Sequence, residues 1–82
     1  MITSGQIRAA RALVRWSSND LAEKSGIGSA TIKRMEVMEG VPKGHIKTLM
    51  AIKQALEGAG VVFTGTPEYQ PGVYLNLEDS NP

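Results

Sequence analysis

Two adjacent cations, Lys33 and Arg34, follow the glycine-containing turn "SGIGS" within residues 21–40. An arginine can donate two parallel hydrogen bonds to the O6 and N7 atoms of guanine, and either cation can hold a phosphate. Ser29 can donate or accept a hydrogen bond, whereas Ala30 can only contact a thymine methyl group or make room for a base. One chemistry open to this stretch is therefore contact with a nucleic acid, and the alternative is that the two cations form a solvated helix surface.

The cationic residues are concentrated in the first part of the chain. The 82 residues carry nine Lys and Arg against eight Asp and Glu, for a net charge of +1. Residues 1–50 hold eight of the cations and four of the anions, whereas residues 51–82 hold one cation and four anions. This distribution favours a polyanionic partner, although a solvated helix face has a similar composition.

The composition indicates one small globular domain with an aliphatic core. Hydrophobic residues make up 41% of the chain and aromatic residues 5%, and there is no cysteine for a disulfide or a thiolate metal site. No signal peptide or apolar run of about 18 residues occurs, so we expect a cytoplasmic protein without a membrane span.

No pattern of an enzyme or a cofactor site is recognisable. No pair of carboxylates stands beside a histidine, and the glycines near residue 27 form a hinge rather than a phosphate-cradling loop. His45 is the only histidine and has no clustered metal ligands around it. We therefore expect no catalytic residue, no metal and no cofactor.

Helical periodicity and capping residues predict four helices. The first three are expected over residues 4–15, 18–25 and 29–38, and the fourth within "KGHIKTLMAIKQALEGAG". Thr3 with Gln6, and Ser17 with Asp20, have the spacing of a capping box. The apolar stripe of the fourth helix is expected to comprise Ile46, Leu49, Ile52, Ala55, Leu56 and Ala59.

The end of the chain changes to a β-type pattern. Residues 61–64, "VVFT", and residues 73–77, "VYLNL", flank the turn-rich segment "GTPEYQPG" and predict a hairpin. We divide the chain into a helical unit at 1–60 and a hairpin with a tail at 61–82. The second unit is a candidate dimerisation arm, because an isolated hairpin has edges that invite pairing. The alternative is that the hairpin folds back on the fourth helix.

Two short helices joined by a glycine-containing turn are the pattern of a helix-turn-helix. The segment "RAARALVRWSSNDLAEKSGIGSATIKRMEVMEG" and its continuation "TLMAIKQALEGAGVVF" resemble the Cro and phage-repressor (Xre-like) regulator family over roughly residues 4–64. The resemblance implies a mainly α, compact four-helix (lambda repressor-like) bundle, here with a C-terminal β-hairpin. It also implies a transcriptional regulator, a repressor in many members, whose third helix enters the major groove of an operator half-site.

The resemblance and the side-chain chemistry together nominate the site. The expected base-contacting residues are Ser29, Ala30, Lys33 and Arg34. The expected contacts to the DNA backbone are Ser18, Thr31, Lys43, His45 and Lys47, with Arg8 or Arg15 as further anchors.

Three details of the resemblance concern individual positions. The family implies a structural ion pair between Arg11 and Glu36. Gly28 stands at a cap position where serine or threonine is usual, although glycine is tolerated there. Ser18 stands where many members have a glutamine that touches the DNA backbone.

The expected partners are double-stranded DNA and a second copy of the chain, because one unit covers only half of a two-fold site. A rival reading is a protein-binding anti-activator or antitoxin-like module that uses the fourth helix and the hairpin. Such a module would be expected to lose its cations on the third helix, and this chain retains Lys33 and Arg34.

Overall fold

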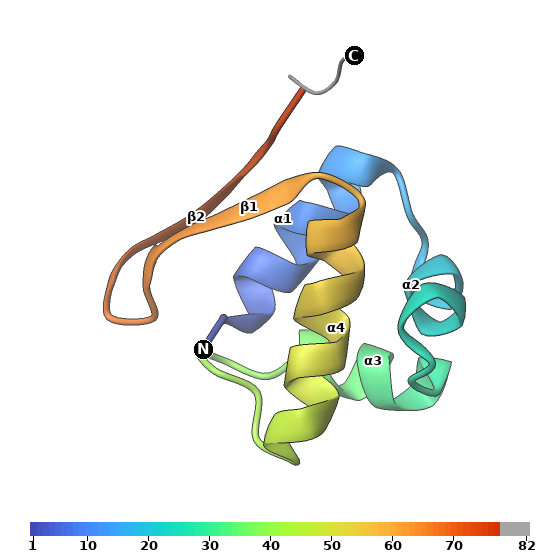
Figure 1. Cartoon of the computed structure of the whole chain (residues 1–82). Coiled ribbons are helices and arrows are strands. Elements are labelled where there is room, and N and C mark those ends of the chain that lie inside the picture. The colour runs from blue at the N-terminus through green and yellow to red at the C-terminus, as the bar shows by residue number, and fades with distance from the viewer. Residues whose placement is uncertain (78–82) are drawn as a thin grey trace.

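The protein, described by a computed structural model over residues 1–77, is helix-rich with a C-terminal antiparallel hairpin, as predicted (Figure 1). The predicted tail at residues 78–82 lies outside the described residues. The helices are α1 (Ser4–Val14), α2 (Ser18–Ser25), α3 (Ser29–Glu36) and α4 (Ile46–Gly58), and the strands are β1 (Val61–Thr66) and β2 (Tyr69–Leu75). Over residues 1–77, no helix combines the length and the hydropathy that crossing a membrane requires.

Side-chain contacts of the capping residues begin α1 and α2 at the positions that the sequence predicted. The Thr3 hydroxyl accepts from the Gln6 backbone N–H at 3.1 Å, and the Gln6 side chain accepts from the Thr3 N–H at 2.8 Å. Ser17 and Asp20 make the same reciprocal pair at the start of α2, at 3.0 and 2.9 Å. These contacts satisfy backbone donors that a helix start leaves without an intrahelical partner.

The core is aliphatic and draws on all four helices, the first residues of the chain and β1. Its buried members are Ile2, Ile7, Ala10, Leu21, Ile32, Met35, Leu49, Ile52, Leu56 and Val61. Figure 1 shows α4 crossing the middle of the molecule, with α2 and α3 on one side and the hairpin extending toward the other. The core therefore fixes the orientation of α3 relative to α1 and α4.

The hairpin packs on the helices and shares their core. The Gln6 side-chain amide donates to the carbonyl oxygens of Thr64 at 3.1 Å and Gly72 at 2.9 Å, which ties α1 to both strands. Phe63 and Val73 are partly buried and pack against the core. The chain folds the hairpin mainly across α1, and β1 also contacts α4. Sequence patterning did not predict the role of Gln6 in this attachment.

The hairpin is longer and its turn tighter than predicted, because the segment expected as a loop pairs almost to its tip. β1 extends to Thr66 and β2 begins at Tyr69, with a shift in register between Thr64 and Thr66. Gly65 lies in this irregularity with φ of 73°. A glycine at a β-bulge allows the strands to continue past an extra residue, and the sequence pattern of turn residues conceals this.

The structure differs from the predictions in two details of the helices. α3 ends at Glu36, two residues before the expected end, where Ser4 donates to the Met35 carbonyl and Arg8 to the Glu36 carbonyl. The next residue, Val37, is 80% exposed. Ile46 does not join the buried stripe of α4, and its side chain is 58% exposed. Helical periodicity predicts which residues share a face, but it does not show whether a neighbouring element covers the whole length of that face.

We predict that Gly65→Ala lowers the free energy of unfolding by more than about 1 kcal/mol, because a side chain at this positive φ is strained. A Cβ built on Gly65 would also overlap the carbonyl oxygen of Gln70. Urea unfolding followed by circular dichroism measures the change.

Gly58→Ala is the matched control. Gly58 lies in the last turn of α4 with no heavy atom within 4 Å of a built Cβ. Alanine should raise the stability there by about 0.5 to 1 kcal/mol, because it is the better helix former. Equal stability of the two variants would contradict the role assigned to Gly65.

Candidate nucleic-acid interface

A short glycine turn joins α2 to α3. α2 ends at Gly26, which has φ of 75° and donates its N–H to the Ala22 carbonyl at 2.9 Å. Ile27 follows as a partly buried residue that packs against the core, and its N–H donates to the Ser25 hydroxyl at 3.2 Å. α3 begins after Gly28, which makes no side-chain capping bond. The turn thus places Ile27 against the core and lets α3 pack on α2.

The two faces of α3 differ sharply. Ile32 and Met35 are buried in the core on one face. Of the four residues expected to contact bases, Ala30, Lys33 and Arg34 are exposed and Ser29 is half-buried. Within residues 1–77, neither Lys33 nor Arg34 forms an ion pair or a side-chain hydrogen bond. Their cationic groups are therefore available to an external anion.

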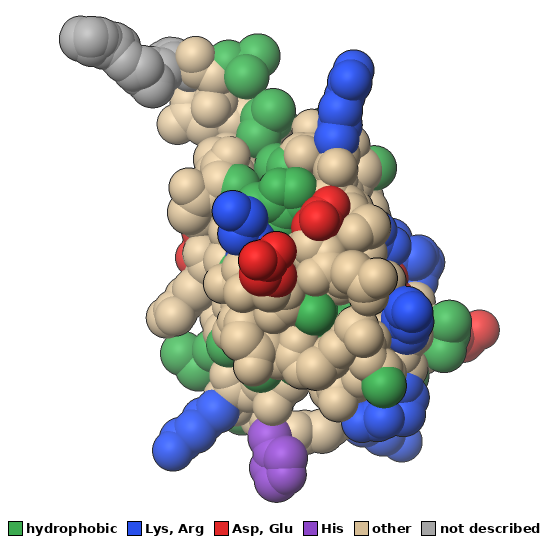
Figure 2. Space-filling model, turned by 90° about the vertical axis from the view of Figure 1, so that its right-hand side faces the viewer, with side chains coloured by type: hydrophobic (Ala, Val, Ile, Leu, Met, Phe, Trp, Pro, Cys, Tyr) green, Lys and Arg blue, Asp and Glu red, His purple; other side chains and the backbone are tan. Residues whose placement is uncertain are grey.

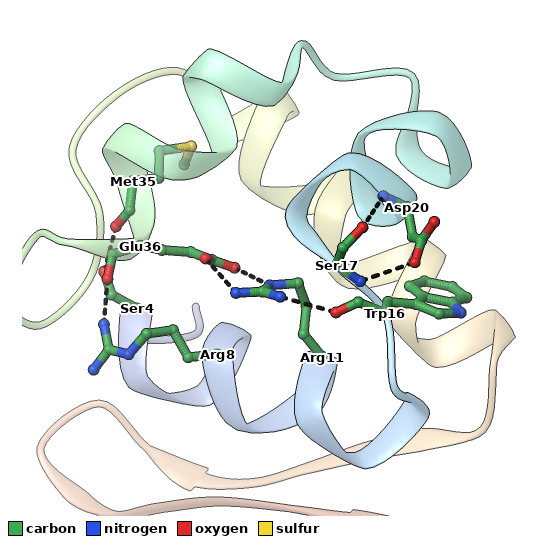
Figure 3. A network of polar contacts seen from close by, with 8 residues as sticks. All are labelled: Ser4, Arg8, Arg11, Trp16, Ser17, Asp20, Met35 and Glu36. Atoms are coloured by element: carbon green, nitrogen blue, oxygen red, sulfur yellow. Dashed lines mark hydrogen bonds and ion pairs between the residues drawn. The ribbon is translucent and has the colours of Figure 1, made fainter.

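The C-terminal end of α3 is held by an ion pair to α1, shown in Figure 3. Arg11 Nε lies 2.6 Å from Glu36 Oε2, and Arg11 Nη2 lies 2.9 Å from Glu36 Oε1. The third donor, Arg11 Nη1, binds the Trp16 carbonyl at 2.8 Å. Two parallel hydrogen bonds fix the direction as well as the distance between the groups.

Burial makes this pair more than a surface contact. The Glu36 side chain is 7% exposed and that of Arg11 is 22% exposed. The hydrogen bond to Glu36 raises the pKa of Arg11 above its ordinary value, against the opposing effect of desolvation. Because the pKa of Arg11 is raised in the folded state, its protonation stabilises the fold at every pH below the ordinary arginine pKa. This stabilisation is lost only as the pH rises above the pKa of the folded state. The Arg11 cation is therefore present throughout the neutral and acidic range.

Two further residues of α1 bind the same end of α3, and the sequence analysis missed both contacts. The Ser4 hydroxyl donates to the Met35 carbonyl at 2.7 Å, and Ser4 is 1% exposed. Arg8 Nη1 donates to the Glu36 carbonyl, while Arg8 itself remains exposed. The last carbonyls of a helix need partners, and the three-residue spacing of Arg8 and Arg11 was the signal that both could supply them.

A polar hollow of about 170 Å³ lies between α3 and the start of α4. It brings together Arg34, expected to contact bases, with Thr31, Lys43 and His45, expected to contact the DNA backbone. The remaining lining residues are Met35, Gly44 and Thr48. Two cations, a histidine and two hydroxyls around one hollow form a set of donors suited to a phosphate group.

Figure 2 shows Lys and Arg side chains gathered along one lower edge of the molecule and the single histidine projecting at the bottom. Lys47 is exposed just after this region, on the first turn of α4, and does not line the hollow. Of the residues expected to contact DNA, Arg34, Lys43 and His45 therefore lie together around the hollow, and Lys47 lies outside it.

Ser18 stands apart from this cluster. It is the first residue of α2 and is half-buried, and it does not line the hollow. The Asp20 carboxylate occupies the same end of α2 as part of the capping box. A carboxylate there is favourable for the helix dipole but repels a phosphate, which makes Ser18 the least supported of the expected backbone contacts.

No protein-family model matches the chain, and no curated protein is significantly similar to it. Within residues 1–77, no three His, Cys, Asp or Glu residues lie together in an arrangement that could hold a metal ion.

We predict that Arg11→Met lowers the free energy of unfolding by about 3 kcal/mol, because it leaves the Glu36 carboxylate buried without its cation. Replacing both partners, Arg11→Met with Glu36→Met, should recover much of this loss, since no charge then remains buried. Chemical unfolding of the single and double variants tests both values.

Arg15→Met is the control, because Arg15 is exposed at the end of the same helix. Its effect should stay within about 0.5 kcal/mol. If Arg11→Met weakened binding to DNA while its thermal stability stayed that of the parent, Arg11 would be a DNA ligand and the structural role would be wrong.

Proposed function

We propose that the protein is a sequence-specific, double-stranded DNA-binding transcriptional regulator of the Cro and phage-repressor (Xre-like) helix-turn-helix type. In this proposal α2, the turn and α3 form the helix-turn-helix, and α3 enters the major groove of an operator half-site. The observation that carries the proposal is a pair of exposed cations, without partners among residues 1–77, on an α3 whose inner face and C-terminal end are both fixed.

Fixing α3 from within supports groove recognition, because a probe must keep its direction when it meets base edges. Ile32 and Met35 anchor its inner face, and the contacts from α1 hold its C-terminal end. Lys33 and Arg34 then project from a helix that is already held in place, so little further entropy is lost in ordering it when DNA binds. A helix with the same cations but no such supports would bind DNA less specifically.

The proposal divides the contacts into two groups. Arg34 can bind guanine in two parallel hydrogen bonds, with Lys33, Ser29 and Ala30 as the other residues facing the bases. The polar hollow supplies phosphate contacts, through Lys43 and the groups around it, that set the register of α3 on the duplex. With Ala30 at one reading position, few side chains are left for direct base recognition, so each half-site should have modest specificity.

We predict that selection from a random duplex pool enriches one sequence motif, and that Arg34→Ala relaxes the preference at one base pair of it. Losing a bidentate contact should cost about 1 to 3 kcal/mol at that position. Sequencing of bound DNA at two salt concentrations, about 50 and 200 mM, provides the measurement.

Lys24→Ala serves as the control, since it removes an exposed cation that lies outside α3 and does not line the polar hollow. It should leave the motif and the affinity unchanged. A uniform loss of affinity for Arg34→Ala, without relaxed preference, would make Arg34 a phosphate anchor. Failure of the parent protein to enrich any motif would overturn DNA recognition and favour the protein-binding, antitoxin-like alternative.

We predict that Lys43→Ala weakens binding to all duplexes about equally and reduces the slope of log K against log salt by about 1. The reason is the loss of one phosphate contact, with its released counterion. Fluorescence anisotropy over a salt series measures the slope.

Lys24→Ala is the control, because Lys24 is an exposed lysine on the last turn of α2, beside the Trp16 ring. It should keep the parent slope. A change of motif on Lys43→Ala, instead of a uniform loss, would count against its assignment to the backbone.

A further inference from the structure

A second hollow, on a different face of α4, is largely apolar and open to solvent. Its volume is about 350 Å³. Its lining residues are Met1, Ile2, Ile46, Leu49, Met50, Lys53, Gln54 and Glu57. It shares no lining residue with the polar hollow beside α3.

Several large apolar side chains around this hollow remain exposed to solvent. Ile46 and Met50, one turn apart on α4, are 58% and 51% exposed, and Met1 is 61% exposed. Ile2 and Leu49 are buried at its base. Exposed apolar side chains grouped around a concave surface are typical of a site that another molecule covers.

Charges at the rim indicate which molecule that is. Lys53 Nζ and Glu57 Oε2 lie 3.8 Å apart, one turn apart on α4, and their side chains are 38% and 46% exposed. A two-fold interface brings the same patch together from both subunits, so each residue type must meet its complement on the other copy. A patch with one cation and one anion side by side meets this condition, because Lys53 can pair with the partner's Glu57 and the reverse.

We propose that this α4 hollow is the dimerisation surface of the protein and that its occupant is the same hollow of a second copy. Met50 and Ile46 would supply the apolar centre of the interface. Lys53 and Glu57 would supply two symmetric ion pairs at its rim, which fix the register and disfavour other partners.

The choice of a second copy rests on the proposed function, because one α3 covers only half of a two-fold operator. Adjacent half-sites place the two recognition helices about 34 Å apart. The molecule measures 38 × 30 × 20 Å, so the half-site spacing is of the same order as one dimension of a single copy. The hollow begins at Ile46, directly after His45, and leaves Lys33 and Arg34 uncovered.

The hairpin is the competing surface, since Tyr69, Tyr74 and Leu77 are exposed there. In Figure 1 the hairpin extends away from α2 and α3, whereas the start of α4 adjoins the loop after α3. Dimerisation through the α4 hollow therefore uses the helix that follows α3 in the chain, whereas the hairpin packs mainly on α1.

A charge-swap experiment tests the interface directly. Lys53→Glu places two glutamates at each rim of a homodimer, and Glu57→Lys places two lysines there, so each variant alone should dimerise at least tenfold more weakly, as an order-of-magnitude expectation for opposed like charges. Mixing the two variants restores an attractive pair at both rims, and the mixture should form a heterodimer about as tight as the parent. Sedimentation equilibrium without DNA measures all three, with circular dichroism to verify folding.

A matched pair of apolar variants separates the two candidate surfaces. Met50→Lys and Tyr74→Lys each place a lysine at a site of nearly equal exposure, 51% and 53%. Met50→Lys should yield monomers and Tyr74→Lys should dimerise like the parent. Three outcomes would each overturn the proposal. In the first, Tyr74→Lys yields monomers and Met50→Lys dimerises like the parent. In the second the parent stays monomeric at all concentrations, and in the third the mixture of charge-swap variants dimerises no more tightly than either variant alone.

Measurements of DNA binding distinguish failure of the dimer interface from failure of the regulator proposal. If the charge swap behaves as expected and no duplex is enriched, the interface stands and the regulator proposal fails. If the parent binds a palindromic duplex and Met50→Lys binds it with the same affinity and two-to-one stoichiometry, the regulator proposal stands and the interface is wrong.

Discussion

Glu36 ends α3 with a carboxylate that is 7% exposed, and a buried carboxylate costs several kcal/mol unless a cation and hydrogen bonds compensate it. Arg11 supplies both, and Ser4 and Arg8 bind the neighbouring carbonyls of the same helix end. Because all three side chains come from α1, the position of α3 depends on the first helix of the chain. The candidate reading face is therefore set by contacts on its opposite side.

The same first helix also carries the hairpin. Gln6 is 4% exposed and donates to a carbonyl of each strand, while its oxygen completes the cap of α1. One helix thus links the end of α3 to the end of the chain, and α4 is left with an uncovered face at its start. The polar hollow and the apolar hollow lie on either side of the first turn of α4, which separates a surface suited to phosphates from one suited to a second copy.

The parts of the fold that were predicted correctly depend on contacts between residues close in sequence. The starts of α1 and α2 follow from reciprocal bonds between residues three apart, and the end of α2 follows from a glycine with positive φ. The end of α3, the tight turn of the hairpin and the exposure of Ile46 were not predicted. The end of α3 and the exposure of Ile46 depend on which element lies opposite, and the local pattern carries no information about that. The tight turn depends on the bulge at Gly65, which the many turn residues around it conceal.

The sequence by itself determined four helices, a C-terminal hairpin, an aliphatic core and the set of cations on and after α3. Only the tertiary structure decided that Arg8 and Arg11 bind the end of α3, that Arg34 joins Lys43 and His45 around one hollow, and that Ile46 stays uncovered. The physical reason is range. Caps and helical stripes arise within one or two turns of chain, whereas Arg11 and Glu36 are 25 residues apart and Ser4 and Met35 are 31 apart.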